Sequence, residues 1–174
     1  MMAAATAPTR IPRLILVAPV NPWSARGKGW SVVLGNPLVA PVFNLAAPRF
    51  LFMHRHYLRR LYADPRRISP GTLEGYSQPL QHPGSFEHGI RILWSWNRDL
   101  RELEASLLRI ADIPTLLIWG DRDTAVDPAS AVALRARFRH CQLVVFEGVG
   151  HLPYEEVPED FNAAVLQFLR QPAM

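Results

Sequence analysis

The stretch "IPTLLIWGDRDTAVDP", residues 113–128, joins a short, continuous run of apolar residues to an acidic loop. Such a run, bounded by proline and glycine, is typical of a β-strand that is buried on both faces of a sheet. Residues 126–138 predict a helix with Asp127 as its N-cap, because a proline follows at the first helical position. "CQLVVFEG", residues 141–148, predicts a second strand, and residues 157–171 predict a second helix. Strands that alternate with helices of this length indicate a parallel sheet and an α/β fold class.

Toward the amino terminus, "IPRLILVAPVNP", residues 11–22, has the same apolar character and predicts a third strand over 14–20. The middle of the chain carries no strand pattern and is punctuated by prolines, and its apolar residues recur at helical spacing. The chain is therefore predicted to have three parts: a partial core in 1–22, a helical insertion in 23–109 and the rest of the core in 110–174. The clearest helical stripe in the insertion consists of Ile92, Trp96, Leu100, Leu103 and Leu107.

The composition is that of a globular protein, with 174 residues and 49% hydrophobic side chains. No uninterrupted apolar stretch is long enough to predict a transmembrane helix. Arg13 and the apolar run after it superficially resemble a signal peptide, but no cleavage motif follows, so the run is interpreted as a strand. The single cysteine, Cys141, excludes an internal disulfide and is expected to pack near a strand start. A cytoplasmic location is the default expectation.

Basic residues are concentrated in the first part of the chain, since residues 1–63 contain eight Lys or Arg and no acid. The densest group lies in residues 53–67, where arginines alternate at helical spacing with Leu58, Leu61 and Tyr62. This pattern predicts an amphipathic helix with a solvated basic face. Binding of phosphate or RNA by this basic face is the less favoured alternative, so a nucleic-acid partner is not expected. The arginines concerned are Arg55, Arg59, Arg60, Arg66 and Arg67.

Two loops carry the residues that chemistry could use. Ligands of open parallel sheets bind at the carboxyl ends of the strands, and there the first loop holds Asp121, Asp123 and Asp127, and the second holds His151. Because neighbouring parallel strands end at the same edge, a carboxylate and the imidazole can meet, which would make the histidine a general base. Alternatives for the single residues are a cap for Asp127, a solvated turn for Asp121 and a structural histidine for His151.

Together, "IPTLLIWGDRDTAVDP" and "GVGHLPYEEVPEDF" resemble the C-terminal third of α/β-hydrolase-fold enzymes, with their G-x-x-D and G-x-G-H loops. "RLILVAPV" is similar to the strand before the family's helical cap, and residues 23–109 have the length of that cap. The resemblance implies an incomplete α/β-hydrolase fold, with three parallel strands, flanking helices and an inserted cap. It implies Asp123 as the triad acid and His151 as the triad base, with no metal and no organic cofactor.

One part of the family pattern is missing. The nucleophile of these enzymes lies on a G-x-S-x-G elbow upstream of the strand before the cap, and here only a few residues precede that strand. The expectation is that the elbow falls before Met1. Ser31 in "GKGWSVVLG" is the internal alternative, but Val33 stands where the elbow has glycine. Ser85 and His88 in "PGSFEHG" are interpreted as a helix start.

The expected function is hydrolysis of carboxylic esters or related small apolar acyl substrates, with a nucleophile from outside this chain, so that the chain alone is inactive. An epoxide or haloalkane hydrolase with an Asp nucleophile is one alternative, and a non-catalytic binding module is the other. The strand over 14–20 is expected to leave one sheet edge unpaired. Marginal stability or self-association through that edge is therefore predicted.

Overall fold

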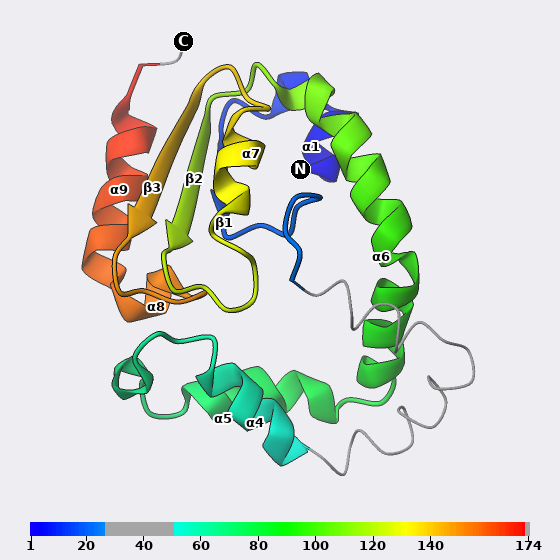
Figure 1. The fold of residues 1–174 in the computed structure, drawn as a ribbon, viewed down its shortest axis with the longest axis vertical. Helices are drawn as coiled ribbons and strands as arrows, with labels where there is room; N and C mark the ends of the chain where they lie inside the picture. The colour runs from blue at the N-terminus through cyan, green and yellow to red at the C-terminus, as the bar shows by residue number, and fades with distance from the viewer. Residues whose placement is uncertain (27–50, 173–174) are drawn as a thin grey trace.

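The structure, a computed structural model, describes residues 1–26 and 51–172. Its centre is a parallel sheet of three strands in the order β1-β2-β3, with Leu14 of β1 beside Thr115 of β2 and Thr115 beside Cys141 of β3. The predicted α/β class and three-stranded parallel sheet are confirmed (Figure 1). The strands are β1 (Leu14–Val17), β2 (Thr115–Gly120) and β3 (Cys141–Phe146).

The three strands differ in burial. All six residues of β2 are buried, as its apolar run predicts, because β2 has a neighbour on each side. The prediction of burial on both faces is wrong for β1, which is half-buried because it has one neighbouring strand in the described sheet. β3 also has one neighbour there and is partly buried. β1 also ends at Val17, before the predicted end at residue 20, since Ala18 has φ 39° and a proline follows. The Ala18 N–H still donates to Ile118 at 2.8 Å.

Helices cover both faces of the sheet. On one face lies α9 (Pro158–Arg170), whose Phe168 packs with Leu116 and Ile118 of β2. The other face, which presents Leu117 and Trp119, is covered by three helices (Figure 1). These are α1 (Met2–Thr6), α7 (Ser130–Arg135) and the C-terminal part of α6 (Ser85–Leu107).

From position 51 onward, the described residues between β1 and β2 form helices and 3₁₀ turns joined by short loops. Figure 1 shows α4 and α5 lying beyond the carboxyl ends of the strands, and α6 running from there back toward α1. Leu58, Leu61 and Tyr62 are buried against Leu152, which follows His151, as the apolar pattern predicts. The predicted helix ends at Arg59, however, so Leu61 and Tyr62 lie in the turn after it. The division into core and cap stays a prediction. The elements are α4 (Leu51–Arg59), α5 (Thr72–Ser77), α6 and the 3₁₀ turns Pro65–Arg67, Gln78–Gln81 and Leu108–Ile110.

The helical stripe predicted for α6 is only partly correct. Leu103 and Leu107 are buried in the core, whereas the side chain of Ile92 is 47% exposed. The reason is the length of α6, whose N-terminal half extends past the sheet that covers its C-terminal half (Figure 1). For residues 1–26 and 51–172, none of the helices combines the length and the apolar character that crossing a bilayer requires.

The helix after β2 begins later than predicted. α7 starts at Ser130, and the Asp127 carboxylate accepts a hydrogen bond from the Ala129 N–H at 3.1 Å. Asp127 therefore caps the turn that leads into α7, a structural role like the one predicted. After β3, the short α8 (Pro153–Glu156) precedes α9.

Cys141 begins β3 and packs beside the core, as predicted. Burial raises the pKa of its thiol to about 11, so the thiolate is scarce at neutral pH. We expect Cys141 to react with a disulfide reagent at pH 8 about 100-fold more slowly than the cysteine of an unstructured peptide. Below about pH 10 the rate should rise about tenfold for each pH unit, because the thiolate is the nucleophile. A peptide-like rate at pH 8, measured under native conditions, would contradict this burial.

Candidate functional site

The structure brings His151 and Asp123 together at the carboxyl ends of β3 and β2. The Oδ2 atom of Asp123 lies 2.8 Å from Nδ1 of His151. Asp123 is 1% exposed, and its Oδ1 accepts hydrogen bonds from the Ala125 and Val126 N–H groups at 2.7 and 2.9 Å. The two backbone donors fix the carboxylate, and its second oxygen remains for the imidazole. A proton on Nδ1 leaves Nε2 as the acceptor that a general base needs.

The histidine loop follows a sharp path that its glycines permit. Gly148 has φ +68°, a conformation that glycine adopts readily. Gly150 is required by close approach instead, because a Cβ there would lie 2.2 Å from the Leu61 carbonyl oxygen. The next N–H, that of His151, donates to the same carbonyl at 2.7 Å. The helical segment between β1 and β2 thus fixes the backbone of the histidine loop.

Glu156 also stabilises the contact between the histidine loop and the helical segment, a role that the sequence does not predict. Its side chain is buried completely and accepts hydrogen bonds from the N–H groups of Gly150 at 2.7 Å, Ala63 at 3.0 Å and Asp64 at 3.3 Å. The Arg67 guanidinium lies 3.9 Å from it. One carboxylate therefore joins the histidine loop to the helical segment. No pattern in the sequence distinguishes Glu156 from its neighbour Glu155.

Asp121, for which a solvated turn was the alternative, also binds the histidine loop. Although the residue is exposed, its Oδ1 accepts hydrogen bonds from the N–H groups of Gly148 at 2.8 Å and Val149 at 3.4 Å. The acid loop and the histidine loop are therefore tied together at a second place beside the Asp123–His151 contact.

His151 lines a cavity of about 250 Å³ between the loops and the helical segment. Arg26 lies in its wall, and its guanidinium also donates to the backbone carbonyl of Asp123. Tyr57 lies in the same wall, and the pKa of its phenol is raised by burial and by the charge of Asp123. The other lining residues are Val20, Asn21, Ser24, Trp96, Leu100, Ala125 and Val126.

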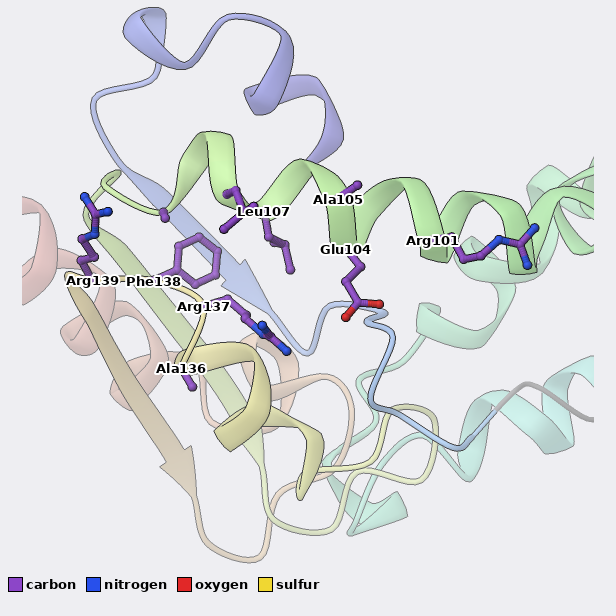
Figure 2. A pocket seen from close by; sticks show the side chains of 10 residues that line it. Arg101, Glu104, Ala105, Leu107, Ala136, Arg137, Phe138 and Arg139 are labelled. Carbon is purple, nitrogen blue, oxygen red and sulfur yellow. The ribbon is translucent and has the colours of Figure 1, made fainter.

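A larger pocket, of about 620 Å³, lies elsewhere and contains neither member of the pair. Figure 2 shows Arg101 and Glu104 projecting from α6, with Arg137 and Arg139 coming from the segment after α7. Arg139 is bound to Asp112, and the Arg137 guanidinium stacks over the Trp23 ring at 4.7 Å. The smaller cavity, because it reaches His151, is the candidate site.

A group of tyrosines fastens α8 to the helical segment beside this site. The phenols of Tyr62 and Tyr76 both donate to the Glu155 carboxylate, and Tyr76 lies 3.3 Å from the Tyr154 hydroxyl. Burial first, and then the hydrogen bond to Glu155, raises the pKa of both phenols. Both therefore remain protonated donors over the ordinary pH range.

The remaining candidates from the sequence lie apart from the pair. Ser31 falls outside the described residues. Ser85 begins α6 and donates to the Pro79 carbonyl at 2.8 Å, and His88 is exposed on the same helix, as expected of a helix start. In residues 1–26 and 51–172, no three His, Cys, Asp or Glu side chains gather closely enough to hold a metal ion.

The arginines of residues 53–67 have an exposed face, as predicted, but several are paired. Arg55 contacts Glu74 at 3.2 Å, and Arg66 contacts Asp64 at 2.8 Å. Arg67 faces Glu156. Only Arg59 and Arg60 in this group are exposed without an acidic partner among the described residues, which weakens the case for a phosphate site.

Known proteins resemble this chain in sequence. The chain is 29% identical to a pimeloyl-[acyl-carrier protein] methyl ester esterase of Aliivibrio salmonicida, a match that covers 97% of the chain and 63% of the esterase. It is 30% identical to Lipase 3 of a Moraxella species, over 34% of the chain and 19% of the lipase. The chain thus spans less than two thirds of the length of either relative.

Solved structures share the fold. The crystal structure of Cfl2 from Burkholderia cenocepacia superposes with a TM-score of 0.74 at 19% identity, over 96% of this chain and 60% of Cfl2. The sequence also matches the profile described as "Alpha/beta hydrolase family" over residues 1–164, a span that includes β1, β2, β3 and both loops of the candidate site. This chain belongs to the alpha/beta hydrolase family.

Proposed function

We propose that Asp123 and His151 are the acid and the base of a nucleophile–His–Asp triad that hydrolyses carboxylic esters or related small acyl compounds. The supporting observation is the 2.8 Å contact between Asp123 Oδ2 and His151 Nδ1, beside a cavity that His151 lines. In this arrangement Asp123 orients the ring and stabilises the imidazolium, while Nε2 removes the proton of the nucleophile. The esterase and lipase names of the relatives agree with this chemistry.

The nucleophile is proposed to lie outside the described residues. Within residues 1–26 and 51–172, Nε2 of His151 has no hydrogen-bond partner. Ser24 lies in the cavity wall, but its hydroxyl accepts a hydrogen bond from the Asp127 N–H at 3.2 Å and is 4% exposed. Ser31 is not proposed as that nucleophile, since Val33 stands where the elbow has glycine, and we expect the 174-residue chain alone to hydrolyse esters no faster than its His151→Ala variant. An Asp nucleophile, acting on epoxides or haloalkanes, remains the alternative reaction.

A chimera tests the proposal. The amino-terminal part of the Aliivibrio salmonicida esterase, up to the segment that it shares with this chain, would be fused to Met1 and assayed on p-nitrophenyl butyrate. We expect turnover that the His151→Ala substitution abolishes and the His88→Ala substitution leaves unchanged, because His88 lies exposed on α6. A chimera that melts cooperatively but hydrolyses no ester would favour the binding-module alternative.

We also propose self-association through the outer edge of β1. The N–H groups of Leu14 and Ala18 donate toward β2, to Pro114 at 2.9 Å and to Ile118 at 2.8 Å. Since donors alternate along a strand, those of Ile15 and Val17 point away from β2, where the described residues place no further strand. In hydrogen exchange, the Ile15 and Val17 amides should become protected as protein concentration rises, while the Leu16 amide is protected throughout. Sedimentation as a monomer at all concentrations would contradict this.

A further inference from the structure

The indole of Trp96 carries an unused hydrogen-bond donor at the candidate site. Trp96 lies on α6 and lines the same 250 Å³ cavity as His151. Its Nε1 atom is buried, and among the described residues no acceptor binds it. By contrast, the buried indole of Trp119 donates to the Val126 carbonyl at 3.3 Å. A buried N–H without an acceptor is rare because its desolvation is not compensated, so an acceptor is expected inside the cavity.

The rest of the wall favours an oxygen-bearing, electron-rich ligand. Arg26 supplies a positive charge, and no Asp or Glu is among the described residues that line the cavity. Asn21 has no capacity left, because its amide donates to Pro19 and Ser130 and its oxygen accepts from Trp23 and Ser24. Val20 and Leu100 provide apolar surface. Apart from Nε2 of His151, the described lining thus offers hydrogen-bond donors, which suits a carboxylate or an ester oxygen on a short apolar chain.

We propose that the Trp96 Nε1–H binds an oxygen of the acyl ligand and so determines which acyl compounds the site accepts. This inference rests on the proposed function, because it assumes that the ligand occupies the cavity beside His151. The cavity has room for about eight water-sized groups, at roughly 30 Å³ for each. Hexanoate and methyl pentanoate match this size and present a carboxylate and an ester respectively.

Titration of the full chain followed by NMR of the five indole N–H resonances tests the proposal without any turnover. Trp96→Phe identifies the Trp96 signal and removes the donor while keeping an aromatic ring. Trp94→Phe is the matched control, since Trp94 lies two residues away on α6 and is 55% exposed. The other indole signals report whether each variant is folded. Hexylammonium, which has the same chain but a donor head group, is the control ligand.

We expect hexanoate, methyl pentanoate or both to shift the Trp96 resonance, and the two ligands distinguish a carboxylate site from an ester site. Hexylammonium should not shift it. Trp96→Phe should bind the active ligand about tenfold more weakly, and Trp94→Phe should bind it as the parent does. A ligand that binds without moving the Trp96 signal, or no binding of either acyl compound, would overturn the proposal. Failure of the ester assay with a positive titration would remove the catalytic proposal and leave the binding site.

Discussion

Asparagine in place of Asp123 is expected to lower kcat of the ester-hydrolysing chimera by about 10⁴-fold, with little change in stability. The asparagine oxygen can still accept from Ala125 and Val126, so the loop keeps its shape. Its amide group then faces Nδ1 of His151 as a donor, and the imidazole must carry its proton on Nε2 instead. That tautomer cannot accept the proton of a nucleophile. Kinetics with p-nitrophenyl butyrate, beside a thermal melt of each variant, measure both effects.

Asp127→Asn is the matched control for this loss. Asp127 lies in the same loop, but its carboxylate accepts from the Ala129 N–H and has no contact with His151. Asparagine caps as well as aspartate does, so kcat should change by no more than about twofold. If Asp123→Asn kept full activity while Asp127→Asn lost it, Asp127 would be the triad acid and the proposed assignment would be wrong.

The second large effect concerns stability. Glu156→Ala should lower the free energy of unfolding by about 3 kcal/mol, because it leaves the buried N–H group of Gly150 and the partly buried N–H groups of Ala63 and Asp64 without their acceptor. Glu156→Gln keeps the size and one accepting oxygen, so its cost should be about half as large. Urea denaturation measures the change. The His151 amide donates to the Leu61 carbonyl, and its hydrogen exchange should become faster by the factor that corresponds to this loss of free energy.

Glu159→Gln separates this local role from a general effect of charge. Glu159 is exposed in the first turn of α9 and should cost less than about 1 kcal/mol, the usual strength of a carboxylate at a helix N-terminus. Equal effects of Glu156→Gln and Glu159→Gln on the His151 amide would show that Glu156 does not hold the histidine loop.

The Asp123–His151 contact could be predicted from the sequence because it follows from strand order. Both residues follow apolar runs, and parallel neighbours with in-register pairing bring the two loops to one edge. The roles of Glu156 and Asp121 could not be predicted, because their partners are backbone N–H groups. Nearly every residue carries a backbone N–H group, so the sequence does not show which of them a carboxylate will bind.

Helical and strand boundaries were predicted less well where they depend on tertiary neighbours. The Ile92 position has the right spacing for the apolar face of α6, yet nothing in spacing alone says where the helix leaves the sheet. The early end of β1 follows from the positive φ angle of Ala18, and the identity of an apolar residue does not predict such an angle.

The cavity beside His151 has two walls with different tolerances for change. On the loop side, residues behind the lining hold the wall in place: carbonyl groups lie too close to Gly120 and Gly150 to leave space for a Cβ, and Glu156 accepts hydrogen bonds from backbone donors. On the other side, Val20 and Leu100 contribute only apolar surface. Under the proposed function, laboratory evolution toward new acyl chains should therefore vary positions 20 and 100 and keep the loop glycines constant. Because the positions proposed to contact the substrate differ from those that fix the loop backbone, substitutions could change the range of substrates without preventing folding.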